Sequence, residues 1–216
     1  MGNNTSVHEK PMHKVSVSGF WMDRTEVTVG EYLSCVAAGV CAKPRVGPGC
    51  NGGKPKARAN HPINCVNWYN AAKFCRWKKK RLPSEAQWEK AARGGSAQPY
   101  PWGFRQPSCR NAHFHKGGAG CGTGKTAPVA SKPAGRNRYG LHDMAGNVWE
   151  WVRDYYSLSF YSVSPTKNPV NRKRGSGYKV VRGGSWKTRY DKLHMTYRSE
   201  AWPSKKSATI GFRCVR

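Results

Sequence analysis

Glycine and proline are the residues that most restrict the fold of this chain. Of its 216 residues, 24 are glycine and 14 are proline, a share well above the roughly 12% of average proteins. Both residues interrupt helices and strands and are typical of turns. The sequence therefore excludes a helical bundle or coiled coil and predicts short elements joined by long loops. Hydrophobic residues make up 38% of the chain and include nine Trp, which is enough to build a core.

The eight cysteines indicate disulfides rather than a zinc or redox site, because no two of them form a Cys-x-x-Cys pair. Disulfides imply an oxidising compartment, so we expect an extracytoplasmic protein, in the periplasm, at the cell surface or in the medium. Residues 1–6 contain no secretory signal, and we expect one to have been trimmed away. No apolar run approaches the roughly 20 residues that a membrane span needs.

Three helices are predicted from their end signals. Thr28 with Glu31, and Ser84 with Gln87, have the spacing of capping boxes, and glycines follow both helices. The helical stretches are residues 28–39, 67–81 and 84–94, and short strands are predicted at 139–141, 148–152, 178–181 and 210–212. With no internal repeat and no linker, the pattern favours one α+β domain over residues 1–216.

Several motifs look catalytic, but the residues around them do not support a catalytic role. Residues 119–126 imitate a phosphate-binding loop, but Pro128 and Pro133 stop the helix that such a loop requires. His113 and His115 lack a carboxylate at a fitting distance and are read as loop histidines. The surroundings of Ser176 lack the Gly-x-Ser-x-Gly turn of a serine hydrolase.

Seven blocks of sequence carry a more specific signal. They include Arg81-Leu82-Pro83-Ser84-Glu85, the run from Tyr139 to Trp151, Arg182-Gly183-Gly184-Ser185-Trp186 and Gly211-Phe212-Arg213-Cys214. In order, spacing and identity the blocks closely resemble the family of formylglycine-generating enzymes, or sulfatase-modifying factors. The resemblance implies an α+β, C-type-lectin-like fold of the formylglycine-generating-enzyme subclass, with low regular secondary structure, long loops and a shallow surface built by the C-terminal third.

Enzymes of that family oxidise a substrate cysteine with molecular oxygen and copper(I), which two of their own cysteines hold. The resemblance places those cysteines within residues 187–197, where this chain has none. Copper(I) prefers soft thiolate ligands, and His194 and Met195 offer only an imidazole and a thioether. We therefore expect no copper and no formylglycine generation, and lean towards a protein that is not an enzyme.

The same resemblance implies scaffold features. The family joins the cysteines that match Cys75 and Cys214, while Cys109 and Cys121 bracket a glycine-rich loop and are expected to pair with each other. Sequence leaves three possible pairings for the other four, Cys35, Cys41, Cys50 and Cys65.

A structural calcium site is also implied by the resemblance. Its ligands would be the carboxylates of Asp143 and Glu150 and the carbonyls of Gly146 and Val148, which are the hard oxygen ligands that Ca²⁺ prefers.

Aromatic and basic residues are mixed in residues 186–210, which the resemblance places on the working surface. Relatives of this subclass include the variable display proteins of diversity-generating retroelements. Such residue types bind anions by charge and stacking, although a solvated basic face is the simpler interpretation. The candidate ligand-binding residues are Trp149, Ser185, Trp186, Lys187, Arg189, Tyr190, Lys192, His194, Tyr197, Arg198 and Trp202.

Net charge points to the kind of partner. The chain carries +27, and its last 46 residues hold +11 of that excess. Outside the cytoplasm an anionic glycan, polymer or protein surface is a more natural partner than a specific nucleic acid. We therefore predict a non-catalytic recognition domain. The alternatives are a metal-dependent oxidase or oxygenase of the same superfamily that acts on a peptide or thiol, and a domain of a larger surface assembly.

Overall fold

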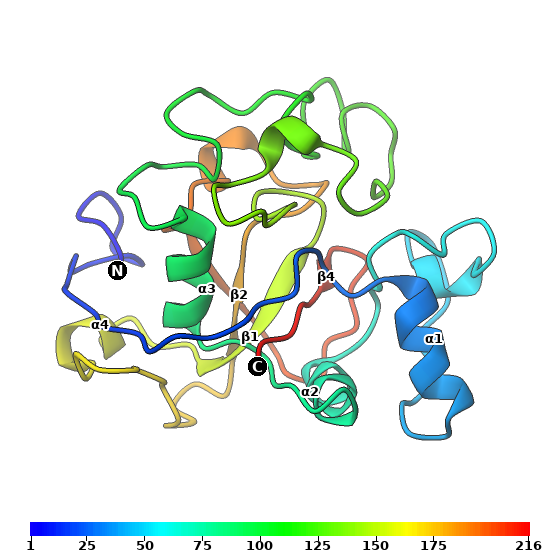
Figure 1. Ribbon diagram of the computed structural model, residues 1–216, viewed down its shortest axis with the longest axis horizontal. Coiled ribbons are helices and arrows are strands. Elements are labelled where there is room, and N and C mark those ends of the chain that lie inside the picture. The colour runs from blue at the N-terminus through cyan, green and yellow to red at the C-terminus, as the bar shows by residue number, and fades with distance from the viewer.

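The computed structural model describes all 216 residues and shows short helices and strands within long loops (Figure 1). No helix in it has the length and apolar character needed to cross a bilayer. The helices are α1 (Val29–Ala37), α2 (Trp68–Trp77), α3 (Glu85–Arg93) and α4 (Phe160–Val163), with 3-10 turns η1 (Asn51–Gly53), η2 (Pro133–Gly135) and η3 (Tyr190–Lys192). The strands are β1 (Trp149–Tyr155), β2 (Lys179–Arg182), β3 (Arg198–Ala201) and β4 (Ile210–Gly211).

Capping boxes begin α1 and α3, as predicted. The Thr28 hydroxyl accepts a hydrogen bond from the Glu31 amide at 3.2 Å, and the Glu31 carboxylate accepts one from the Thr28 amide at 2.8 Å. Ser84 and Gln87 make the same reciprocal pair before α3. Gly94 then ends α3 in the left-handed conformation, with φ at 59°.

The four strands form one sheet in the order β3-β2-β1-β4, in which only β4 runs parallel to its neighbour. Three of the four predicted strands are present. Residues 139–141 form a turn instead, because the Asn137 side chain accepts a hydrogen bond from the Leu141 amide at 3.1 Å. The unpredicted strand is β3, a polar sequence whose first residue, Arg198, is buried and pairs with Glu85.

Two apolar clusters cover the two faces of the sheet. On one face, Trp151 and Val181 pack with α1 and α2. On the other, Val152 and Val180 pack with Trp88 of α3. Successive side chains of a strand point to opposite faces, so one short strand supplies both clusters. Figure 1 shows α3 on one side of the sheet and α1 and α2 on the other.

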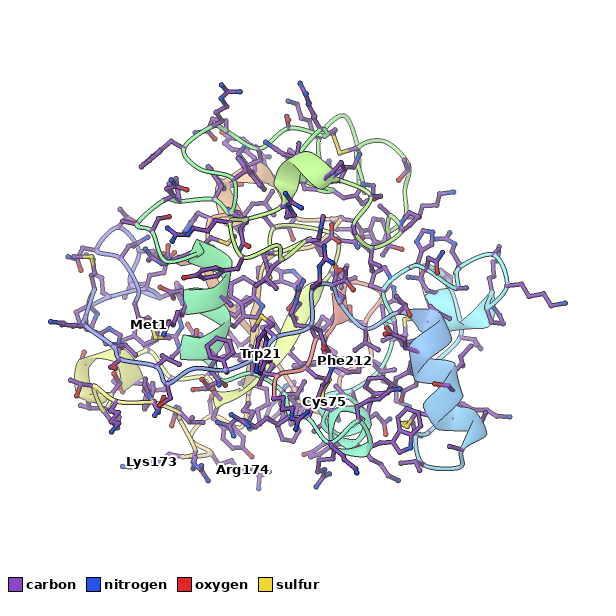
Figure 2. The ribbon with its side chains drawn as sticks, in the orientation of Figure 1. Met1, Trp21, Cys75, Lys173, Arg174 and Phe212 are labelled. Carbon is purple, nitrogen blue, oxygen red and sulfur yellow. A yellow bond between two sulfur atoms is a disulfide. The ribbon has the colours of Figure 1, made fainter.

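All eight cysteines are paired, and their sulfur atoms lie among the side chains drawn in Figure 2. The two expected disulfides are both formed, and the other four cysteines pair in the order of the chain. The pairs are Cys35–Cys41, Cys50–Cys65, Cys75–Cys214 and Cys109–Cys121. The third ties α2 to the C-terminal end across 139 residues of sequence.

Candidate functional site: a basic loop over a buried ion-pair network

The predicted binding segment forms the connection between β2 and β3, which we call the basic loop (residues 183–197). It leaves β2 through Gly183 and Gly184, whose φ values are 93° and 80°. A Cβ atom on Gly184 would lie 2.5 Å from the Leu193 side chain, so only glycine allows the loop to fold back this closely. The turn η3 lies at the far end of the loop.

Four predicted residues are exposed together on this loop, namely Lys187, Arg189, Tyr190 and Lys192. We call them the basic patch. The Lys187 ammonium lies 4.7 Å from the centre of the Trp186 ring, and that of Lys192 lies 5.9 Å from the centre of the Tyr197 ring. These ammonium groups remain available to a ligand, since cation–π contacts at exposed sites contribute only about 0.5–1 kcal/mol.

Three half-buried aromatic rings adjoin the basic patch. The Tyr197 ring centre is 5.9 Å from that of Trp149 and 5.6 Å from that of His194. His194 Nδ1 is 2.8 Å from the Thr196 hydroxyl and 3.7 Å from a carboxylate oxygen of buried Glu9. Burial lowers the pKa of His194, although Glu9 opposes this effect. His194 also lines a hollow of about 360 Å³ between the loop and the N-terminal residues.

Ser185, Trp186 and Arg198 are buried rather than exposed, which corrects the prediction that they line the surface. Ser185 Oγ lies 3.1 Å from the Thr188 hydroxyl. The Trp186 indole donates to the Ala208 carbonyl at 3.1 Å. Their polar atoms are thus used inside the protein.

Trp202 is exposed, but it lies away from the basic patch. In the β2–β3 pair, Arg182 faces Arg198 at the loop end, and Lys179 faces Ala201 at the opposite end. Trp202 follows directly after Ala201, and its ring centre lies 4.3 Å from that of Tyr178.

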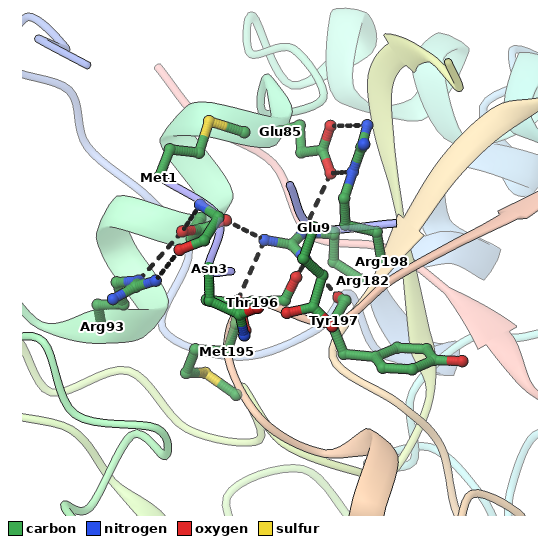
Figure 3. A network of polar contacts seen from close by, with 12 residues as sticks. Met1, Asn3, Glu9, Glu85, Arg93, Arg182, Met195, Thr196, Tyr197 and Arg198 are labelled. Atoms are coloured by element: carbon green, nitrogen blue, oxygen red, sulfur yellow. Dashed lines mark hydrogen bonds and ion pairs between the residues drawn. The ribbon is translucent and has the colours of Figure 1, made fainter. Parts of the chain in front are cut away.

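Beneath the basic loop, two arginines and two glutamates form a buried network (Figure 3). Arg198 donates to both carboxylate oxygens of Glu85, at 2.7 and 2.9 Å. Arg182 donates to Glu89 at 2.5 Å and to the Thr196 carbonyl at 2.8 Å. Burial alone would raise the pKa of Glu85, but Arg198 and Arg182 together hold it below its usual range. The network fixes the returning end of the basic loop to α3.

The N-terminal residues join the same network. The Gly2 amide donates to Glu89 at 2.9 Å, and Arg93 donates to the Gly2 carbonyl at 3.0 Å. The Asn3 side chain donates to the Thr196 hydroxyl at 2.7 Å. Our sequence analysis missed these residues. The one available signal was the spacing of Glu85 and Glu89, which places two carboxylates on one face of α3.

Chemically, the basic loop offers charge and aromatic surface. It contains no cysteine, and every cysteine elsewhere is in a disulfide, so no thiolate is present to hold copper. No three His, Cys, Asp or Glu side chains anywhere in the chain come together in a way that could hold a metal ion. The side chains that this loop exposes are therefore mainly cationic and aromatic.

The expected calcium ligand Glu150 already has protein partners, which corrects that part of the calcium prediction. Arg213 donates to both of its carboxylate oxygens at 2.8 Å, and the Trp88 indole donates to one of them at 2.8 Å. An ion at Glu150 would have to compete with this bidentate pair.

Asp143 has a different carboxylate neighbour. It accepts a hydrogen bond from the Ala130 amide at 2.6 Å and lies beside Glu26, whose two carboxylate oxygens are buried and meet no N–H donor. Burial and the nearby Asp143 raise the pKa of Glu26 well above its usual range. Gly146 and Val148 are buried in the same loop as Asp143. A hard cation therefore fits the Asp143 and Glu26 carboxylates better than the predicted set that includes Glu150.

Comparison with known proteins places this architecture in a family. Residues 1–216 match the family described as the Sulfatase-modifying factor enzyme 1-like domain. The formylglycine-generating enzyme of Streptomyces coelicolor is 39% identical over 171 residues, which cover 73% of this chain and 53% of that protein. The chain spans a smaller part, from 24% to 35%, of the chlamydial serine/threonine-protein kinases Pkn1 that it also matches.

Solved structures show the same fold. PvdO from Pseudomonas aeruginosa has a TM-score of 0.85 at 31% identity, with 100% of this chain and 89% of that one covered. Treponema denticola variable protein 1 has a TM-score of 0.71 at 24% identity, with 99% and 90% covered. The α+β, C-type-lectin-like fold that the sequence predicts is therefore confirmed.

Proposed function

Because the chain belongs to the sulfatase-modifying factor family, yet its basic loop lacks the cysteines that such an enzyme would use, we propose that it is a non-catalytic recognition domain. The basic patch binds an anionic glycan, polymer or protein surface. The observation that carries the proposal is the grouping of Lys187, Arg189, Tyr190 and Lys192 on a loop that a buried network holds in place. A fixed loop loses little conformational entropy on binding, which favours affinity.

The distribution of charge supports an anionic partner. Six of the eleven acidic residues are buried, whereas only four of the 38 basic residues are. The buried acidic residues contribute little to the outer field of the protein, and within the basic patch only Asp191 offsets the three bases. The surface is more basic than the net charge alone suggests, and it will attract polyanions in a salt-dependent way.

A triple substitution tests the basic patch. Replacing Lys187, Arg189 and Lys192 by Ala should abolish binding to an array of acidic glycans, because the charges that face the ligand are gone. A matched control replaces three exposed bases elsewhere, Lys43, Lys54 and Lys56, and should retain binding. Equal loss in both variants, or binding that salt and the triple substitution leave unchanged, would contradict the proposal.

Metal analysis of protein purified without chelator separates recognition from catalysis. We expect no stoichiometric copper or iron. Either metal at one equivalent, together with oxygen uptake in the presence of a thiol peptide, would favour a metal-dependent oxidase instead. The four disulfides support our further proposal that the chain acts outside the cytoplasm.

A structural calcium site can be formed by a different pair of carboxylates from the pair that the sequence predicts. We propose that Asp143 and Glu26 supply the carboxylates of a structural Ca²⁺ site, since the Glu26 oxygens meet no N–H donor within the protein. The ion would favour the ionised form of Glu26, whose pKa is otherwise raised, and by holding both carboxylates it would stabilise the loop from 143 to 150.

A further inference from the structure

A second basic hollow lies away from the basic loop, between α2 and β1. It has a volume of about 250 Å³. Figure 1 shows α2 at the lower edge of the molecule, whereas the orange segment near residue 190 lies at the upper edge. The hollow is therefore separate from the basic patch and from the hollow beside His194.

Three arginines from three different segments line this hollow. Arg76 comes from α2, Arg81 from the loop before α3, and Arg153 from β1. No acidic residue is among the lining residues. The nearest acid in sequence, Asp154, does not line the hollow, and its carboxylate accepts hydrogen bonds from the amides of Glu85 and Asn171.

Arg153 has an unused donor. Its Nε atom is buried and makes no hydrogen bond. Burial lowers the pKa of Arg153, Asp154 opposes this effect, and Arg81 and Arg172 add to it. No acidic side chain lines the hollow itself, so an anion bound among the three guanidinium groups would reduce their mutual repulsion and satisfy the buried Arg153 donor.

Aromatic side chains form the other wall. The Trp68 indole is held in place by its hydrogen bond to the Val152 carbonyl at 2.7 Å, and the Lys179 ammonium lies 4.3 Å from its ring centre. The Tyr69 ring meets it edge to face, with the ring centres 5.6 Å apart. Leu82 adds an apolar surface. The wall presents flat aromatic surface, which suits a flat ligand.

We propose that this hollow binds a phosphate monoester whose organic part is a flat, apolar ring. Three guanidinium groups match the geometry and the double charge of a phosphate monoester better than those of a singly charged anion. A volume of about 250 Å³ is sufficient for a phosphate group with one ring. The site is independent of the proposed role of the basic patch.

Calorimetric titration with phenyl phosphate tests the site on the intact chain. We expect millimolar affinity or better, with inorganic phosphate and the singly charged phenyl sulfate each binding more weakly. Arg153→Gln and Arg76→Gln should each reduce the affinity for phenyl phosphate by about tenfold or more, because a charged hydrogen bond is lost. Tyr69→Leu should weaken phenyl phosphate but leave inorganic phosphate unchanged.

Lys73→Gln is the matched control, since Lys73 is an exposed base of the same helix that does not line the hollow. It should bind phenyl phosphate as the unmodified protein does. Equal loss with Lys73→Gln and Arg76→Gln would show general attraction to a basic surface and overturn the proposal. So would unchanged affinity in Arg76→Gln, or the absence of any binding. Arg76 lies on an exposed helix face, so this variant gives an answer even if Arg153→Gln fails to fold.

Discussion

Arg198 shows how a single charged residue can belong to the core of this protein. Its side chain is fully buried, pairs with Glu85 and lies 3.9 Å from the centre of the Tyr161 ring. Another of its nitrogens donates to the His8 carbonyl at 3.1 Å. A buried charge of this kind is tolerated because nearly every donor has a partner.

Removing that charge should be costly. Arg198→Met leaves Glu85 buried with a weaker counter-charge, and we expect the free energy of unfolding to fall by about 3–5 kcal/mol. Urea denaturation measures the change. Arg189→Met, at an exposed position of the basic patch, should alter stability by less than about 0.5 kcal/mol. A similar small effect at Arg198 would show that the ion pair does not hold the loop.

Glu26 is the residue at which the calcium proposal can be tested. Chelation of Ca²⁺ should lower the melting temperature of the unmodified protein, because two buried carboxylates lose their counter-ion. Glu26→Gln removes one charge and should weaken this response to chelator, whereas Glu200→Gln, at an exposed position, should leave it intact. A melting temperature that does not depend on calcium in all three proteins would contradict the site.

Among the elements, α3 connects the sheet to the network beneath the basic loop. It contributes Trp88 to one core cluster and Glu85 and Glu89 to the buried ion pairs. Its start depends on the local capping box of Ser84, and its end on Gly94. Because the ion pairs require Glu85 in the first turn, the cap also positions the first residue of the network.

Ser84→Ala tests the role of the cap. The loss of the Ser84 hydroxyl should reduce stability by about 1 kcal/mol, since the Gln87 amide loses its hydrogen-bond acceptor. Ser84→Asp keeps an acceptor and should retain more of the stability. Chemical denaturation measures the free energy of unfolding of both variants. Equal losses of stability would show that the side-chain hydrogen bond at the cap contributes little to it.

For the whole molecule, the disulfides differ in the length of chain that they close. Cys75–Cys214 spans 139 residues, and Cys35–Cys41 spans six. In the chain-entropy model, a longer closed loop restricts the unfolded chain more strongly. The long disulfide should therefore be the stronger constraint on the unfolded state.

Replacing both cysteines of each pair by Ala compares the two constraints. We expect a loss of about 5 kcal/mol for the Cys75–Cys214 pair and about 2 kcal/mol for the Cys35–Cys41 pair. The measurement is the free energy of unfolding in urea under non-reducing conditions. A larger loss for the short pair would show that native-state packing, and not chain entropy, determines how much each disulfide contributes to stability.

Local sequence determined the beginnings of the helices, the disulfide-bonded character of the chain and its family. A capping box needs only residues three apart, such as Ser84 and Gln87, so its signal is complete in the sequence. The family blocks likewise keep their order and spacing along the chain.

Tertiary structure alone decided which basic residues are exposed to solvent. Arg189 and Arg198 look alike in sequence, yet one is exposed and the other pairs with Glu85, which is 113 residues away. In the same way, Arg213 lies 63 residues after Glu150 and donates to its carboxylate, so this expected calcium ligand already has a partner. Burial of a charge depends on a partner brought near by folding, and no local pattern encodes that partner.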